Sequence, residues 1–172
     1  TDKSVQPFSA DAGKGEFHGD GFSVLLTSAV DDPKPGSDEY LRADGDCWVG
    51  SHGYPTANGY QLARAFRGTV RPSDGGNETC MDVFVVDVPH DITIPGADGP
   101  LEGTALSYPK PPKGDTVRRL TFTANDPDIR LRGIGGHLRS SPDGKWIAYT
   151  SNMTGRNEIH VQPFPSGNGH WQ

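Results

Sequence analysis

Apolar residues are scarce in this chain. They make up 33% of its 172 residues, below the roughly 45–50% that is usual in globular domains. Its longest apolar stretches, around Phe22–Leu26 and Val83–Val88, fall far short of the roughly 20 residues that a transmembrane helix needs. The sequence therefore excludes a membrane-spanning helix. With 23 glycines and 15 prolines it also has little room for helices, which favours a turn-rich, all-β fold.

Positive charge and cysteine are also in short supply. A formal net charge of −6 disfavours nucleic acid as a partner, because phosphate binding needs a basic surface. Cys47 and Cys80 are the two cysteines, and they form either one disulfide or two unrelated thiols. The sequence has no G-x-S-x-G motif, so it carries no serine-hydrolase signature and no assembled catalytic set.

The last third of the chain has the pattern of consecutive strands. Ser141–Gly144 forms an SPDG turn with Pro at its second position and Gly at its fourth, which predicts a hairpin between a strand around Leu138 and the alternating run 146–151. A Gly- and Asn-rich turn leads into a third strand, 159–162, which Pro163 ends. Local chemistry thus predicts a three-stranded meander.

A weaker copy of this pattern lies upstream, where GDGFSVLLTSAVDD parallels DGKWIAYTSNMTG and MDVFVVDVP parallels NEIHVQPFP. The repeat predicts two blade-like units in one domain of 1–172: 17–123, with an insertion over 31–78, and a truncated unit over 124–172. Within the insertion we expect a long loop with a short helix around Tyr60–Phe66. After the run MDVFVVDVP we expect a Pro- and Gly-rich connector, and then a strand over Val117–Thr123 that ends the first unit.

Particular motifs resemble known proteins. SSPDGKWIAYTS followed by NEIHVQPFP is similar to the blade repeat of TolB-like β-propellers. PKPGSDEY, CWVGSHGY, VFVVDVP, PLEGTALSYPKPPKG and RRLTFT, in that order, resemble the middle of the YidR-type Tol-related family over roughly Gly19 to Tyr149. The resemblance implies a propeller of about twice this length, and it carries no catalytic assignment.

The fold that follows is an all-β partial β-propeller of two to three blades, each a four-stranded antiparallel meander, with a long loop insertion. Two or three blades cannot close a ring, which takes roughly four to eight. We therefore expect the chain to be a fragment that continues past Gln172 into further SPDG-containing repeats.

In a propeller the first strand of each blade lines the central channel, so His137 and Arg139, two residues apart, are expected to face it together. Arg132 adds positive charge nearby, and His18 and Asp20 occupy the equivalent place upstream. One interpretation makes these residues a ligand-binding cluster, and the other makes them ordinary solvated channel residues. Metal sites normally draw three or more protein groups, so no metal site is predicted, although a divalent metal stays open as a cofactor.

The insertion carries two further sets of residues, each with two interpretations. Its acidic side chains either bind calcium or form a solvated charged loop, and its aromatic rings either stack on a sugar or protein partner or pack as core. The acidic set is Asp31, Asp32, Asp38, Glu39, Asp44 and Asp46, and the aromatic set is Tyr40, Trp48, Tyr54 and Tyr60.

Two functions follow as hypotheses. The first is a non-enzymatic binding or scaffold propeller with a protein or carbohydrate ligand. The alternative is a metal-assisted oligouronide lyase, in which channel histidines hold a divalent metal. The compartment is not fixed by the sequence, and the resemblance favours an extracytoplasmic one.

Overall fold

The chain folds almost entirely into antiparallel strands. The computed structural model describes residues 24–75, 78–102, 106–125 and 133–166, and within these ranges the helical structure is one 3-10 turn, η2 (Thr123–Asn125). The strands are β1 (Ala43–Trp48), β2 (Tyr54–Thr56), β3 (Gly59–Gln61), β4 (Ala63–Val70), β5 (Cys80–Asp87), β6 (Thr116–Arg119), β7 (Ile134–Ser140), β8 (Trp146–Ser151) and β9 (Glu158–Pro163). The expected all-β class is confirmed.

The first sheet has four strands in the order β1-β4-β5-β6. β4 and β5 pair without interruption from Ala63 opposite Asp87 to Val70 opposite Cys80, and both strands are buried along most of their length. A small hairpin, β2–β3, lies between β1 and β4 in the chain, so the sheet is a meander with one hairpin inserted after its first strand.

The second sheet is the meander β7-β8-β9 that the SPDG pattern predicted. Gly144 adopts a positive φ of +68°, and its amide donates to the carbonyl of Ser141 at 3.0 Å, which closes the turn between β7 and β8. The Ser141 hydroxyl accepts from the amides of Lys145 and Trp146, so local hydrogen bonds close this turn.

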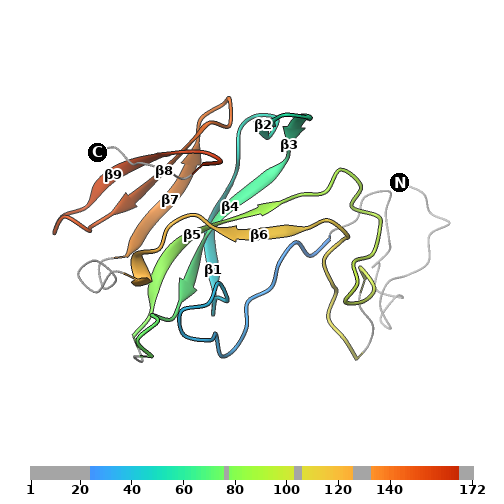
Figure 1. Cartoon of the computed structure of the whole chain (residues 1–172), viewed down its shortest axis with the longest axis horizontal. Coiled ribbons are helices and arrows are strands. Elements are labelled where there is room, and N and C mark those ends of the chain that lie inside the picture. The colour runs from blue at the N-terminus through green and yellow to red at the C-terminus, as the bar shows by residue number, and fades with distance from the viewer. Residues whose placement is uncertain (1–23, 76–77, 103–105, 126–132, 167–172) are drawn as a thin grey trace, which may run out of the picture.

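The two sheets pack against each other through one apolar core. β7 contacts β1, β4 and β5 across the interface, and Figure 1 shows β7 as the strand of the second sheet that lies nearest the first. The first sheet and its loops contribute Val49, Tyr54, Ala63, Ala65, Val83 and Val85, and the second contributes Ile134, Leu138, Ile147, Tyr149 and Phe164. The opposite face of the first sheet has its own core of Tyr40, Phe66, Val70, Cys80, Phe84, Val86 and Ala124.

Two turns interlock at one end of this interface. The amide of Gly50 donates to Ser140 Oγ, and the amide of Ser51 donates to the carbonyl of Pro142, both at 2.9 Å. Gly144 sits so close to the facing turn that a Cβ on it would lie 2.4 Å from the carbonyl oxygen of Gly53. The turn after β1 and the SPDG turn therefore fit together only because glycine stands at the contact.

Four sequence-based expectations differ from the structure. Residues 60–66, expected as a short helix, form β3 and the start of β4, because β5 offers a strand that pairs along all of β4. Residues 24–26, expected within a strand, are not in one. The range 31–78, expected as a long loop, contains β1 to β4, and these include two strands of the main sheet. The expected strand over Val117–Thr123 is shorter, ending at Arg119.

No disulfide joins the two described cysteines, Cys47 and Cys80. Cys47 packs against the core between the sheets, whereas Cys80 belongs to the core on the opposite face of the first sheet. Because the sheet itself separates them, the disulfide alternative does not apply to this fold.

Trp146, at the start of the predicted alternating run 146–151, is 39% exposed, while Tyr149 on the opposite face of β8 is buried. The core between the sheets takes only the face of β8 that carries Ile147 and Tyr149. We therefore expect Trp146→Ala to lower the free energy of unfolding by about 1–2 kcal/mol, short of the roughly 3–5 kcal/mol for a fully buried large aromatic. Urea unfolding measures this, and a loss above about 3 kcal/mol would contradict the exposed position.

Candidate functional site

His137 and Arg139 lie on the exposed side of β7, and Leu138 between them is fully buried in the core. The pairing of β7 with β8 is irregular between Gly135 and Arg139, where the β7 segment is longer than its partner. Gly136 has a φ of +66° in this bulge, and a Cβ on it would come within 2.9 Å of Thr150 Oγ1. The glycines thus shape the backbone that presents His137.

Arg139 points toward the first sheet. Its Nη1 donates to the carbonyl of Leu138 at 2.9 Å. Burial raises the pKa of the Cys47 thiol on β1, and the positive charge of Arg139 partly opposes that rise, so the guanidinium lies close enough to act on β1. Of the five residues predicted to bind a ligand, the structure therefore brings His137 and Arg139 to one exposed edge. His18, Asp20 and Arg132 lie outside the described residues.

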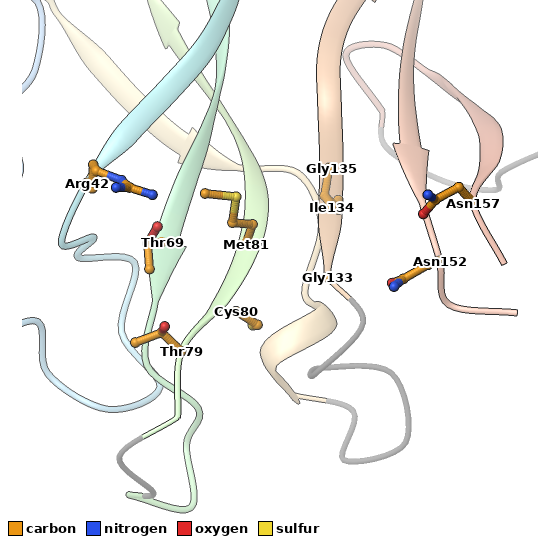
Figure 2. A pocket seen from close by; sticks show the side chains of 10 residues that line it. All are labelled: Arg42, Thr69, Thr79, Cys80, Met81, Gly133, Ile134, Gly135, Asn152 and Asn157. Atoms are coloured by element: carbon orange, nitrogen blue, oxygen red, sulfur yellow. The ribbon is translucent and has the colours of Figure 1, made fainter. Parts of the chain in front are cut away.

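A hollow of about 340 Å³ opens between the sheets at the end where β7 begins. Figure 2 shows the side chains of the first sheet on one side of it and those of the β8–β9 turn on the other. The lining residues are Arg42, Thr69, Thr79, Cys80, Met81, Gly133, Ile134, Gly135, Asn152 and Asn157. Neither His137 nor Arg139 lines it, so the hollow is a second candidate site, which the sequence did not predict.

Two oxygen atoms among the described lining residues are inaccessible to solvent. These are Thr69 Oγ1 and Asn152 Oδ1, and within the described part of the chain neither has a hydrogen-bond partner. A buried polar atom without a partner costs about 1–3 kcal/mol, and such atoms are rare in folded proteins. A ligand that forms hydrogen bonds with these two oxygen atoms would therefore remove this cost.

The acidic residues of 31–46 are mostly paired with basic side chains. The pairs are Asp32 with Arg71, Asp38 with Arg119, Glu39 with Lys34, Asp44 with Arg67, and Asp46 with Arg64. Within the described residues no three His, Cys, Asp or Glu side chains gather in a way that could hold a metal ion. Asp44 and Asp46 lie on β1, so the acidic set is divided between a loop and a strand, and calcium binding by it stays a prediction.

The four aromatic residues of the predicted insertion divide evenly. Tyr40 and Tyr54 are buried in the two cores, whereas Trp48 and Tyr60 are 51% and 58% exposed. The guanidinium of Arg64 lies 4.8 Å from the centre of the Trp48 ring. The core interpretation therefore holds for the first two, and stacking on a partner stays a prediction for Trp48 and Tyr60.

A polar cluster joins β2 to the outer edge of the first sheet. The Tyr54 hydroxyl donates to Asp87 Oδ1 at 3.1 Å, and Arg118 donates to both residues. Asp115, just before β6, has an inaccessible Oδ1 with no hydrogen-bond partner. Burial, reinforced by the negative charge of Asp87, raises the pKa of Asp115 to about 6.

This pKa predicts a pH-dependent stability. Between pH 3.8, the ordinary pKa of an aspartate, and about pH 6, Asp115 is protonated to a greater extent in the folded state than in the unfolded state. Its contribution to stability therefore falls as the pH rises through this window and is lowest above it. We expect Asp115→Asn to be more stable than the wild type at pH 7.5, with the difference shrinking towards pH 4. Urea unfolding of both proteins across this range measures it, and a difference that is constant with pH would contradict it.

One curated relative is similar to most of the chain. The uncharacterized protein YidR of Escherichia coli strain K12 is 35% identical over 137 residues, which cover 78% of this chain and 30% of the relative. The chain thus spans about 30% of the length of the relative it matches. No protein-family model matches the chain, and no solved structure does. Among the described residues no helix is long and apolar enough to cross a membrane.

Proposed function

We propose that the chain forms neighbouring blades of a TolB-like β-propeller that acts as a binding scaffold. The observation that carries the proposal is the packing of two antiparallel meanders face to face, with their first strands, β1 and β7, in contact. Neighbouring propeller blades have this arrangement, in which the first strand of each blade lies nearest the axis. The SPDG turn supports the same assignment.

The first sheet supplies a complete blade in this proposal, since β1, β4, β5 and β6 follow one another outwards. The β2–β3 hairpin is an addition between its first and second strands. The second sheet supplies three strands of the next blade. A crystal structure of the E. coli relative tests this directly: the matched region should form consecutive blades of a closed ring, and an open two-sheet sandwich would refute it.

A binding role assigns the exposed edge of β7 to ligand contact. His137 and Arg139 face solvent there, and a guanidinium holds a carboxylate through charge-assisted hydrogen bonds. The proposed ligands are carboxylate-bearing groups of a protein or carbohydrate partner. To separate binding from a metal-assisted lyase, the chain should be incubated with oligouronides and divalent metals. Binding without cleavage supports the scaffold, and a metal-dependent unsaturated product would instead establish the lyase.

We expect Arg139→Ala to weaken the binding of oligouronides or simple carboxylates about tenfold, because a hydrogen bond to a charged group contributes about 1.5–3 kcal/mol. Arg156→Ala is the matched control, since Arg156 is exposed in the β8–β9 turn and pairs with Glu158. Titration calorimetry measures both. Equal effects of the two substitutions, or no binding by the wild type, would leave the β7 edge without a ligand role.

A further inference from the structure

We propose that the hollow between β4, β5 and β7 binds a sugar, a small ring rich in hydroxyl groups. Where the sugar carries a carboxylate, this group faces Arg42. The inference deepens the binding role proposed above by naming a ligand class and a second site for it. Its residues come from both sheets: Thr69 and Met81 from the first, Ile134 from the second, and Asn152 and Asn157 from the turn between β8 and β9. Figure 2 shows the side chains from the first sheet on one side of the hollow and those of Asn152 and Asn157 on the other.

The unpartnered oxygens decide which ligand chemistry fits. A carboxamide oxygen such as Asn152 Oδ1 can only accept a hydrogen bond, so its partner must be a donor. Sulfate and simple carboxylates bring only acceptors, which leave this oxygen unsatisfied, and phosphate near neutral pH brings a P–OH donor but no apolar ring face. A ligand hydroxyl donates and accepts, so hydroxyl groups can satisfy Asn152 Oδ1 and Thr69 Oγ1 together.

The charges around the hollow select among hydroxylated ligands. Arg42 is a lining residue with a largely exposed side chain, and it lies 4.0 Å from the carboxylate of Asp44. None of the described lining residues is acidic. A cationic ligand is therefore disfavoured, and an acid group on the ligand gains a charge-assisted contact with Arg42.

The shape of the hollow suits a ring. Its volume of about 340 Å³ is at the small end of the roughly 300–1,000 Å³ typical of ligand pockets. Met81 and Ile134 supply apolar surface for the C–H face of a ring, while Gly133 and Gly135 let a ligand approach the backbone of β7. Carboxamides and hydroxyls then surround the ring edge, where the ligand hydroxyls project.

The test uses D-glucuronate, D-galacturonate, D-glucose and D-galactose as probes on the intact 172-residue chain, with ligand-observed saturation-transfer NMR and calorimetry. We expect the uronates to bind in the hollow, the matching hexoses to bind there several-fold more weakly, and any binding of acetate or phosphate to be unaffected by substitutions in the hollow. Thr69→Val, which removes one hydroxyl, should weaken binding up to about tenfold. Asn157→Ala, an exposed change that leaves the core intact, should weaken it as well.

Thr116→Val is the matched control, because Thr116 is exposed on β6 and does not line the hollow. Arg139→Ala separates the two sites: it should weaken the binding of simple carboxylates at the β7 edge and leave the Thr69-dependent binding of the neutral hexoses unchanged. Failure of all four sugars to bind, or binding of all four that Thr69→Val leaves unchanged, would overturn the inference. A chain that binds carboxylates through Arg139 but no sugar through Thr69 would retain the scaffold proposal and lose only this site.

Discussion

Asp82→Ala is expected to lower the free energy of unfolding by about 3–5 kcal/mol, the usual cost of removing one partner from a buried ion pair. Asp82 on β5 is fully buried, and it accepts hydrogen bonds from Arg119, from the hydroxyl of Thr121 at 2.6 Å and from the amide and hydroxyl of Thr123 at 2.9 and 2.8 Å. Its loss removes the buried countercharge of the Arg119 guanidinium, leaves the exposed Asp38 at 3.6 Å as an ion-pair partner, and breaks the tie between β5 and η2.

Urea unfolding, followed by tryptophan fluorescence, measures the effect. Asp98→Ala is the control, because Asp98 is an exposed carboxylate in the connector, and it should change stability by less than about 0.5 kcal/mol. Asp82→Asn separates charge from shape, since it keeps the size of the side chain and removes its charge. A loss below about 1 kcal/mol in Asp82→Ala would show that the network contributes little beyond packing.

Gly144→Ala is the second substitution for which we expect a large effect, a loss of more than about 2 kcal/mol. The left-handed backbone of Gly144 costs roughly 1–2 kcal/mol for a residue with a Cβ. The new Cβ would also lie 2.4 Å from the carbonyl oxygen of Gly53 and 2.8 Å from the Cα of Tyr54, both of which are backbone atoms that cannot move without shifting the turn.

Gly75→Ala is the matched control for Gly144→Ala. Gly75 has a φ of +74°, close to the +68° of Gly144, but a Cβ on it would meet no atom within 4 Å. Gly75→Ala therefore reports the backbone cost alone, and the difference between the two variants in urea unfolding is the cost of separating the interlocked turns. Equal losses in the two variants would mean that the turns do not press against each other in solution.

The second sheet could be predicted because its structure is local. The SPDG turn closes through hydrogen bonds within a few residues, and the alternation of 146–151 matches the buried and exposed faces of β8. Turn chemistry and a period of two are both readable over such short distances. The same alternation placed His137 and Arg139 correctly on the exposed side of β7.

The first sheet was harder to predict because its strands depend on distant partners. The segment 60–66 contains residues such as Ala65 and Arg64 that suit a helix, and only the pairing of Arg64 with Val86 and of Phe66 with Phe84 makes β4 a strand. The hollow was missed for the same reason. Thr69 and Asn152 are 83 positions apart by their numbers, and neither belongs to a motif that signals a site.

The interlocked turns also bear on how the chain folds. The hydrogen bond from Gly50 to Ser140 joins residues 90 positions apart, whereas β7, β8 and β9 are joined by short turns. Closing a long loop costs more entropy than closing a short one, so contacts of this separation form late. We therefore expect the second sheet to form early and the docking of the two sheets to follow the rate-limiting step. A substitution at a glycine of the interlocked turns, Gly50 or Gly144, is then expected to raise the unfolding rate and to leave the folding rate nearly unchanged. These two glycines therefore set the lifetime of the docked state.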